Sequence, residues 1–478
     1  MNFKLVFKLA GKTLLVEAVC MLLPLCVALL YREDPKPFLI AILITAAVGL
    51  LLALPKSDTR FNAREGFFSV GLIWVLVGLT GAIPFYLCGY FSSYIDCLFE
   101  AISGFTTTGA SILTAVEPLP RGILFWRSFI HWLGGMGILV LTIALLPSLG
   151  ARTLHVMKAE SPGPIISKLV PKSSQSSKIL YGIYFGLTAL MVVCLLLTGM
   201  PLYDCLVNAF ATAGTGGFSI LNTSIGGYNS PAAEIIIGIF MLVFSVNFAL
   251  YFLVLCGKWR QALKSDELRF FGGVVGVSVL FISFNIASLY DNFGTALRQA
   301  FFQVSTIIST TGFSSADFDQ WPEFSRILLV MLMFCGACAG STGGGVKCSR
   351  ILLLFKSIGR EIRLILHPRS VGVVRLDGHV VEEKVLHTVL VFLGAYMLIA
   401  FGASLLVALD NFSFATTFTA VVACIGNIGP GLEMVGPMGN YSMFSGFSKL
   451  VLTLCMVIGR LEVFPILVLF SRSAWTRN

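Results

Sequence analysis

An all-α polytopic membrane protein is the fold class that this sequence predicts, and three observations lead to it. The chain is apolar throughout, with 56% hydrophobic and only 12% charged residues. It contains long apolar runs, each near or above the roughly 20 residues that a helix needs to cross a bilayer. Four connections between these runs are rich in small polar residues and glycine. We therefore expect ten spans: four pseudo-symmetric helix–pore-loop–helix units around one pore, preceded by two extra N-terminal helices.

The composition excludes several other classes of protein. A soluble globular protein averages about 25% charged residues, so this chain cannot form a water-soluble outer shell even though 478 residues would allow several domains. A secreted disulfide scaffold, a nucleic-acid-binding protein and a disordered chain are excluded on the same grounds. The net charge of +9 is expected to reflect Lys and Arg kept on the cytoplasmic side of a membrane.

Ten apolar runs define the predicted spans. The first is expected to be a span rather than a cleaved signal peptide, because no small-residue cleavage site follows it. The runs lie at 13–30, 37–55, 67–88, 123–147, 179–200, 232–256, 271–290, 325–355, 386–409 and 446–471.

The distribution of basic residues predicts the orientation of these spans. Most Lys and Arg residues fall into alternate loops, which is the bias found on the cytoplasmic side of membrane proteins. These loops carry Lys56, Arg60 and Arg64; Arg152, Lys158, Lys168, Lys172 and Lys178; Lys258, Arg260, Lys264 and Arg269; Arg350 to Lys384; and Arg472 and Arg477. Both termini are therefore expected to be cytoplasmic.

The four connections on the opposite side repeat one pattern. The segments 96–113 and 204–221 align without gaps and are identical at nine of eighteen positions. The third copy reads Ser-Thr-Thr-Gly-Phe-Ser over 309–314, and the fourth reads Gly-Asn-Ile-Gly-Pro-Gly over 426–431. The aligned glycines are Gly109, Gly217, Gly312 and Gly429, spaced by 108, 95 and 117 residues.

Each repeated segment is expected to form a short re-entrant helix followed by extended backbone. Asp96 and Asp204 are predicted to cap two of the helices, with Asp291 and Asp410 in less regular equivalent positions. Non-helical backbone at membrane depth is tolerated where it lines a cavity or is buried in protein. Four converging helix C-termini with glycine-turned carbonyls would attract a monovalent cation and replace part of its hydration shell. Close packing of small residues is the alternative for any single segment.

These motifs resemble the superfamily of potassium transporters that comprises TrkH/TrkG, KtrB and the HKT proteins. The resemblance rests on the four repeated segments, on Gly-Ser-Thr-Gly-Gly-Gly-Val-Lys over 340–347 and on Gly-Arg-Leu-Glu over 459–462, and it covers essentially the whole chain. The two extra N-terminal spans are similar to those of the TrkH branch.

The resemblance implies a K⁺ uptake protein of the bacterial inner membrane with a channel-like pore. It assigns a K⁺-binding selectivity filter to Thr107, Thr108, Gly109, Thr215, Gly216, Gly217, Thr310, Thr311, Gly312, Asn427, Ile428 and Gly429. Glycine at all four aligned positions goes with K⁺ rather than Na⁺ in this superfamily, while the fourth segment departs most from a regular filter strand. K⁺ would be the transported ligand, with no organic cofactor on this chain. The implied partners are a second copy of the chain, a cytosolic TrkA-like nucleotide-binding regulatory ring and membrane lipids, but no nucleic acid.

The resemblance also implies a gate within the eighth span. Its residues are Gly340, Ser341, Thr342, Gly343, Gly344, Gly345 and Lys347, together with Arg460 in the tenth span. Consecutive small residues and glycines break a helix, at about 1 kcal/mol per glycine relative to alanine. A nucleotide-binding P-loop is excluded, because Val346 separates the glycines from Lys347 and Cys348 replaces Ser or Thr. Close packing against a neighbouring span is the alternative.

The charged residues within the predicted spans leave alternatives open. Arg460 matches a pore-facing arginine of the family, and an ion pair with Glu462 or another acid is its structural alternative. Lys347 could contact the gate or lie at the cytoplasmic mouth. His131 and Arg127 are expected to be packing or helix-terminus residues. The basic stretch from Arg350 to Arg375 is expected to be a cytoplasmic loop, part of which could dock the regulatory subunit.

Two further functions compete with K⁺ uptake. A Na⁺-permeable or Na⁺/H⁺-coupled symporter is weakened by the lack of a clear Asp/Glu pair at mid-membrane. A membrane-embedded enzyme is the most remote, because the five histidines have no metal-ligand or catalytic spacing. We therefore predict that the protein is not an enzyme. The predicted units are an N-terminal extension over 1–56 and four pore repeats over 57–150, 151–258, 259–358 and 359–478.

Overall fold

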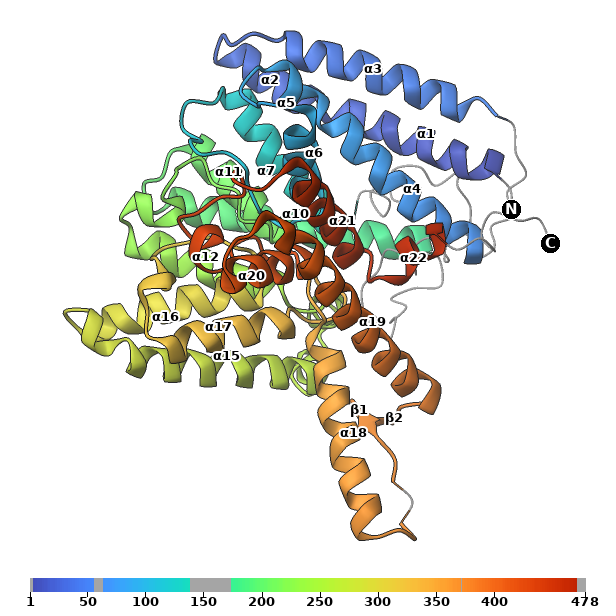
Figure 1. Ribbon diagram of the computed structural model, residues 1–478, viewed down its shortest axis with the longest axis vertical. Coiled ribbons are helices and arrows are strands. Elements are labelled where there is room, and N and C mark those ends of the chain that lie inside the picture. Colours follow the sequence, from blue (N-terminus) through green and yellow to red (C-terminus); the bar gives the residue numbers. More distant parts are fainter. Residues whose placement is uncertain (1–2, 56–62, 138–172, 371, 471–478) are drawn as a thin grey trace.

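The structure is a computed structural model that describes residues 3–55, 63–137, 173–370 and 372–470 (Figure 1). It is mainly helical, with one short β-hairpin (Figure 1). Several of the basic residues that predict the topology lie outside the described residues, among them Arg152 and Arg472. The ten-span threading with cytoplasmic termini therefore stays a prediction.

The N-terminal extension is a helical hairpin that packs along the first unit. It consists of α1 (Phe3–Cys20), α2 (Leu22–Leu30) and α3 (Lys36–Ala53). Two glycines bring α1 and α3 together: a Cβ atom built on Gly11 would lie 2.5 Å from the carbonyl oxygen of Gly49. Small residues permit this close approach of backbones, which is a common way for helices to associate within a membrane.

The remaining helices follow in four groups along the chain, and each group contains one of the repeated segments. The first group is α4 (Ala63–Gly81), α5 (Ile83–Leu87), α6 (Tyr94–Phe105) and α7 (Arg121–Gly135). The second is α10 (Ser173–Leu196), α11 (Leu202–Gly214), η2 (Ser224–Tyr228), α12 (Pro231–Phe244), α13 (Phe248–Leu255) and α14 (Trp259–Ala262).

The third group is α15 (Asp266–Asn285), η3 (Ala287–Leu289), α16 (Phe293–Ile308), η4 (Phe318–Gln320), α17 (Glu323–Cys335) and α18 (Cys348–Leu366). The fourth is the antiparallel pair β1 (Arg375–Leu376) and β2 (His379–Val380), then α19 (Glu383–Val407), η5 (Ala408–Asp410), α20 (Phe414–Ile425), η6 (Glu433–Val435), α21 (Gly446–Arg460) and α22 (Phe464–Phe470).

The predicted unit boundaries remain predictions. The boundary at 150/151 lies outside the described residues, and the boundary at 358/359 falls inside α18.

Six helices in the described part of the chain are long and apolar enough to cross a membrane by themselves. They correspond to the predicted first, second, third, fifth, seventh and ninth spans. In the fourth predicted span α7 ends at Gly135, and the part of the predicted range after residue 137 lies outside the described residues. The sixth, eighth and tenth predicted spans are each interrupted.

The sixth predicted span, over 232–256, consists of two helices rather than one. α12 and α13 meet at an angle of 92°. Asn247 caps the second helix, since its side chain accepts the backbone N–H of Ala249, 2.9 Å away. The backbone groups freed by the bend pair with another segment: the Ser245 carbonyl accepts the N–H of Cys338, and the Phe248 N–H donates to the Gly340 carbonyl, both at 3.0 Å. Such pairing is what permits a broken helix at membrane depth.

The tenth span is also broken, directly after Arg460. Glu462 and Val463 both have positive φ angles, of 55° and 67°, and the backbone N–H of Val463 donates to the Ile458 carbonyl. This turn separates α21 from the short α22. Arg460 therefore lies at the end of a helix rather than within a continuous span.

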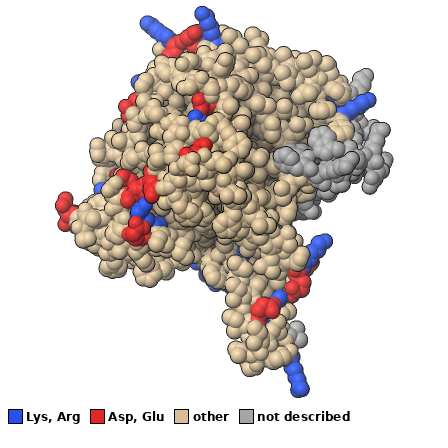
Figure 2. Space-filling model, in the orientation of Figure 1, with Lys and Arg blue, Asp and Glu red and all other residues tan. Residues whose placement is uncertain are grey.

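The surface agrees with residence in a membrane. Charged side chains on the face shown in Figure 2 gather at a few places, with broad uncharged stretches between them. Large apolar side chains on several candidate spans are exposed, including Leu43, Leu398 and Leu405, which are 69%, 75% and 75% exposed. Lipid would cover such side chains in a bilayer.

One part of the fold projects from the helical body. α18 extends away from the other helices beside β1, β2 and the start of α19 (Figure 1). The hairpin is fixed by a small apolar cluster formed by Leu353, Val374, Val381, Leu386 and Val389.

Candidate functional site

The four helices that we predict to be re-entrant are α6, α11, α16 and α20. Polar side chains other than the predicted aspartates cap three of them. Ser93, Asn292 and Ser413 each accept the backbone N–H of the residue three positions later. The prediction that aspartates cap these helices is therefore wrong. The reason is that a short Ser or Asn side chain at the N-cap position itself reaches the free N–H group.

The predicted aspartates stabilise the segments in other ways. Asp96 lies in the first turn of α6, where it accepts the Ser93 hydroxyl at 2.9 Å and pairs with Lys449 at 2.7 Å. Asp204 accepts the hydroxyl of Tyr228 at 3.2 Å. Carboxylates in the first helical turn also interact favourably with the helix dipole.

After each re-entrant helix the backbone adopts one repeated conformation. The residue two positions before each aligned glycine has a positive φ: 57° for Thr107 and Thr215, 58° for Thr310 and 53° for Asn427. The aligned glycines also have positive φ: 77° for Gly109, 74° for Gly217, 86° for Gly312 and 95° for Gly429. L-residues rarely adopt this region, which explains glycine at these positions.

The four segments, which we call the filter loops, meet around one common centre. A Cβ atom built on Gly109 would lie 1.8 Å from the Gly216 carbonyl oxygen, and one on Gly217 would lie 2.1 Å from that of Thr311. The contacts continue from Gly312 to Ile428 at 2.1 Å and from Gly429 to Thr108 at 2.7 Å. Each glycine thus faces the carbonyl that precedes the glycine of the next loop. The loops form a closed ring in chain order.

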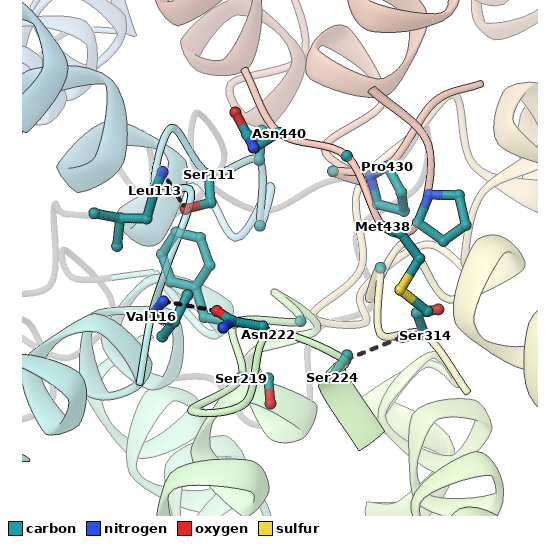
Figure 3. A pocket seen from close by; sticks show the side chains of 18 of the residues that line it. Ser111, Leu113, Val116, Ser219, Asn222, Ser224, Ser314, Pro430, Met438 and Asn440 are labelled. Carbon is teal, nitrogen blue, oxygen red and sulfur yellow. Dashed lines mark hydrogen bonds between the residues drawn. The ribbon is translucent and has the colours of Figure 1, made fainter. Parts of the chain in front are cut away.

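A cavity of about 160 Å³ adjoins this ring and is lined by all four aligned glycines. Its walls carry Ser111, Ser219, Ser224, Asn440 and Pro430, which Figure 3 places around the opening. Among the described residues that line it there is no Asp or Glu, and one residue, Arg127, carries a positive charge. The cavity is therefore polar without a fixed negative side-chain charge.

Hydroxyl pairs brace the first and third filter loops. The Oγ1 atoms of Thr106 and Thr108 are 2.8 Å apart, and the equivalent atoms of Ser309 and Thr311 are 2.7 Å apart. Equivalent bracing cannot occur in the second and fourth loops, because glycine occupies the first of these positions in both.

His131 supports the second loop instead. Its Nδ1 lies 2.7 Å from the Gly104 carbonyl, and its Nε2 accepts the backbone N–H of Phe218 at 3.4 Å. This pattern assigns the ring proton to Nδ1. The histidine is fully buried and binds the backbone both at the end of α6 and in the second filter loop, so it is a packing residue, as the sequence suggests.

The fourth loop differs from the other three. The Asn427 amide donates to Thr108 Oγ1 at 3.0 Å and to the Met456 carbonyl at 2.9 Å. The Tyr441 hydroxyl donates to the Gly429 carbonyl at 2.7 Å. Side chains therefore hold this loop at two points. The distance from a Cβ atom built on Gly429 to the Thr108 carbonyl oxygen, 2.7 Å, is also the longest of the four glycine-to-carbonyl distances in the ring.

An ion pair behind the first loop was missed from the sequence. Arg127 is 2.7 Å from Glu100 Oε1, and both side chains are almost completely buried. Glu100 also accepts the Ile112 N–H at 3.1 Å, while Arg127 donates to the Ser219 carbonyl at 3.1 Å. The pair thus connects the segment that follows the first filter loop with the segment that follows the second. Two opposite charges in adjacent apolar segments were the signal that could have revealed it.

Replacing Arg127 by methionine is expected to destabilise the protein by about 3–5 kcal/mol, because Glu100 would remain buried without its partner. Thermal unfolding of the purified protein in detergent measures the effect. Arg360→Met is the matched control: that arginine pairs with Glu361 and Glu383, whose side chains are 59% and 75% exposed, and exposed pairs contribute about 0–1 kcal/mol. Equal destabilisation by both variants would contradict the expectation.

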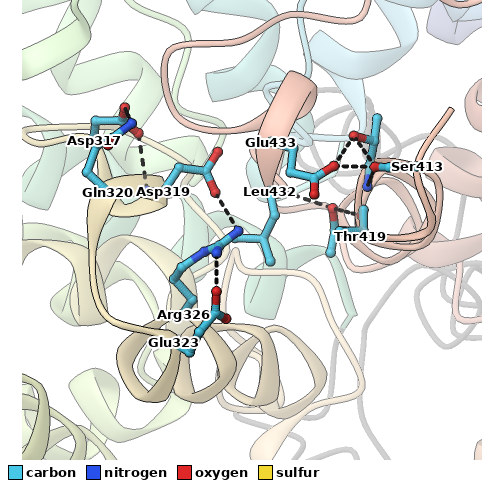
Figure 4. Close-up of polar contacts among 11 residues, drawn as sticks. Asp317, Asp319, Gln320, Glu323, Arg326, Ser413, Thr419, Leu432 and Glu433 are labelled. Atoms are coloured by element: carbon cyan, nitrogen blue, oxygen red, sulfur yellow. Dashed lines mark hydrogen bonds and ion pairs between the residues drawn. The ribbon is translucent and has the colours of Figure 1, made fainter.

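Two separate sets of polar contacts lie near one another, one within the third unit and one within the fourth (Figure 4). Arg326 on α17 reaches Glu323 at 2.5 Å and Asp319 at 3.4 Å. The hydroxyls of Ser413 and Thr416, at the start of α20, both donate to Glu433, and these hydrogen bonds hold the pKa of Glu433 below its ordinary value. They fix η6 to the start of the fourth re-entrant helix.

The predicted gate residues lie in a non-helical segment over 336–347, which we call the gating loop. The loop packs directly against the third and fourth filter loops. The Gly344 N–H donates to Thr310 Oγ1 at 2.6 Å, and a Cβ atom on Gly344 would lie 2.7 Å from the Gly426 carbonyl oxygen. On its other side, Thr342 Oγ1 donates to the Phe244 carbonyl at 3.1 Å, and Gly340 pairs with the bend between α12 and α13.

Arg460 joins three parts of the site. One guanidinium nitrogen donates to the Thr342 carbonyl at 2.7 Å and to Thr107 Oγ1 at 3.3 Å. The other lies 2.5 Å from the carbonyl oxygens of both Gly134 and Gly135 at the end of α7. The arginine therefore connects the gating loop with the first filter loop.

The neighbouring charges have other partners. Glu462 pairs with Arg350, whose guanidinium also lies 3.9 Å from the ring centroid of Phe392. Lys347 is buried, with 2% exposure, and donates to the Gly343 carbonyl within the gating loop. Of the two positions that the sequence left open for Lys347, the structure therefore places it against the loop.

Together, apolar spanning helices, a ring of four backbone loops and a polar segment packed against that ring define a membrane protein that transports cations. In the described residues, no group of three or more His, Cys, Asp and Glu side chains could hold a metal ion.

Comparisons with known proteins lead to the family. The profile of the TrkH family, described as cation transport protein, matches residues 35–476. The Trk system potassium uptake protein TrkH of Salmonella typhimurium is 37% identical over 485 residues, covering 99% of this chain and 100% of that protein. The Trk system potassium uptake protein TrkG of Escherichia coli is 33% identical, covering 99% of both. The crystal structure of the potassium transporter TrkH from Vibrio parahaemolyticus superposes with a TM-score of 0.90 at 32% identity over 100% of both chains.

The chain belongs to the TrkH family of cation transport proteins. It is a membrane transport protein and not an enzyme.

Proposed function

We propose that this protein takes up K⁺ through a channel-like pore whose selectivity filter is the ring of four filter loops. The single observation that carries the proposal is the closed succession of glycine-to-carbonyl contacts around that ring. Backbone carbonyls held at fixed positions can replace the hydration shell of a monovalent cation. The re-entrant helices end at the ring, so their C-terminal dipole ends add negative potential there.

Two observations favour K⁺ over Na⁺ as the transported ion. Relatives of 33–37% identity over nearly the whole chain are named potassium uptake proteins. All four aligned filter positions are glycine in this chain, which is the pattern that the superfamily associates with K⁺. The Na⁺-coupled alternative is therefore not favoured.

We propose that the gating loop controls ion flow, with Lys347 and Arg460 holding it. The loop packs beneath two filter loops and contains glycines with positive φ at positions 336, 340 and 345. Many of its contacts are single hydrogen bonds to backbone carbonyls, hydroxyls and one carboxylate, which a segment that exchanges between two arrangements can break and form again.

The remaining proposals concern assembly and location. The names of the relatives refer to a Trk system, which supports a cytosolic TrkA-like regulatory ring as a partner. We further propose a homodimer embedded in lipids of the bacterial inner membrane, with both termini cytoplasmic. The projecting end of α18 is a candidate contact for the ring, since Ile362 and Ile365 there are 53% and 77% exposed.

Complementation tests the proposed function. A bacterium that lacks its own K⁺ uptake systems is expected to grow at low K⁺ when it produces this chain with the matching regulatory subunit. The initial rate of K⁺ uptake, measured with Na⁺ as competitor, checks the ion preference. Absence of growth despite confirmed membrane expression of both proteins would contradict the proposal.

A further inference from the structure

One carboxylate holds the two ends of the gating loop together. Glu267 lies in the first turn of α15, and its side chain is almost completely buried. Its Oε1 atom accepts the backbone N–H of Ala339 at 2.7 Å and that of Ser349 at 3.1 Å. These two donors lie before and after the glycine-rich part of the loop. A single oxygen that accepts both fixes the ends relative to one another and to α15.

The preceding residue, Asp266, makes a second set of contacts on the opposite side. Its Oδ2 accepts the Lys356 ammonium at 2.7 Å and the Asp377 N–H at 3.2 Å. Its own N–H donates to Asp377 Oδ1 at 2.6 Å. Lys356 also donates to the Arg375 carbonyl at 2.8 Å. Asp266 is thus bound directly to the turn of the β1–β2 hairpin and, through Lys356, to its first strand.

The two sets of contacts belong to adjacent residues in one helical turn. A helical turn is stiff compared with the loop and the hairpin that it contacts, because its backbone is held by internal hydrogen bonds. A shift of the hairpin that moves Asp266 must therefore also move Glu267. The proposed topology places the hairpin in the cytoplasm, while the gating loop lies against the filter loops.

We propose that Glu267 is the positioning residue of the gating loop, and that Asp266 with Lys356 couples the β1–β2 hairpin to that loop through the first turn of α15. The inference rests on the proposed function in one respect, which is that the loop gates ion flow. Beyond that function, the proposal names the residues that hold the gating loop. It also names the contacts through which a shift of the β1–β2 hairpin would move that loop.

Hydrogen exchange of the full-length protein in lipid nanodiscs tests the anchor without any ion being transported. Glu267→Ala is expected to speed amide exchange over residues 336–349 at least tenfold, because hydrogen bonds to a charged acceptor are among the strongest in proteins. Glu267→Gln keeps a carbonyl oxygen and is expected to stay within about threefold of the unmodified protein. Unchanged exchange in a folded Glu267→Ala variant overturns the anchor. If that variant does not fold, Glu267→Asp, whose shorter side chain cannot reach both N–H groups, replaces it with the same expected direction.

K⁺ flux into vesicles, without any regulatory subunit, supplies the second measurement. Glu267→Ala is expected to raise the initial flux about tenfold and to leave the half-saturating K⁺ concentration within about twofold, because the filter loops are untouched. The positioning role is overturned if Glu267→Ala leaves the initial K⁺ flux unchanged. It is also overturned if the half-saturating K⁺ concentration changes by as large a factor as the flux. If the unmodified protein passes no K⁺, the proposed function fails while the exchange measurement still decides whether Glu267 anchors the loop.

The coupling has its own pair of variants. Lys356→Met removes the contacts to Asp266 and Arg375 and is expected to speed exchange both in the hairpin, over residues 372–381, and in the gating loop. Arg360→Met is the matched control one turn further along α18, where the arginine contacts Glu361 and Glu383 instead. The control is expected to leave gating-loop exchange unchanged. Faster exchange confined to the hairpin in Lys356→Met, or an equal effect of both variants on the loop, overturns the coupling.

Discussion

Replacing Gly109 by serine is expected to reduce K⁺ uptake at low K⁺ at least a hundredfold and to increase relative Na⁺ permeation. Two effects act together. The φ angle of 77° disfavours any residue with a Cβ atom, and that atom would lie 1.8 Å from the Gly216 carbonyl oxygen. The second filter loop must therefore shift, which moves the carbonyl groups proposed to coordinate K⁺. Initial uptake rates of K⁺ and Na⁺ in complemented cells measure the change.

Two glycine controls separate backbone strain from the contact within the ring. Gly199 has a φ of 84° but nothing within 4 Å of a built Cβ atom, so Gly199→Ser adds comparable strain without a clash. We expect that variant to retain uptake within about twofold. Gly429→Ser, with its nearest atom at 2.7 Å, is expected to be intermediate. Normal uptake and selectivity in Gly109→Ser would contradict the proposed filter.

Replacing Arg460 by alanine is expected to raise K⁺ flux in the absence of the regulatory subunit about tenfold. The change removes the hydrogen bonds that connect the gating loop at Thr342 with Thr107 and with the end of α7. It also removes a positive charge close to the proposed ion path. Two like charges about 6 Å apart repel by about 3 kcal/mol at an effective dielectric constant of about 20, so the loss favours cation passage. Flux into vesicles loaded with a K⁺-sensitive dye measures the result.

The conservative variant Arg460→Lys distinguishes the two contributions. Lysine keeps the charge but cannot reproduce the forked geometry of the guanidinium group. We expect an increase of about threefold, smaller than that of alanine. Equal flux in Arg460→Ala and in the unmodified protein would show that Arg460 has only a packing role.

Local patterns in the sequence predicted much of the site. The repeat places glycine at four aligned positions. Glycine at the same position of every repeat predicts a positive φ angle there, and each of the four glycines has one. The break in the eighth span is also evident from its glycines, although the non-helical segment extends over 336–347 rather than 340–345 alone. These features depend on neighbouring residues, so the chain order is enough to predict them.

Other features depend on contacts between distant residues. The bend between α12 and α13 is stabilised by the gating loop, which lies about a hundred residues later in the chain. The Glu100–Arg127 pair and the attachment of Arg460 to Gly134 join separate helices. Periodicity carries no signal for such pairings, because it reports only which face of an element is apolar.

The sequence by itself determined that this chain lies in a membrane, that it contains four glycine-rich segments of one repeated pattern and that glycines interrupt the helix of its eighth predicted span. Only the tertiary structure decided the order of the ring, the side chains that brace each filter loop and the partners of Arg460, Lys347 and Glu267. The physical reason is that spans, turns and glycine conformations depend on residues close together in the chain. The ring, in contrast, is closed by backbone carbonyl groups, which every residue has, so residue types do not show which carbonyls meet.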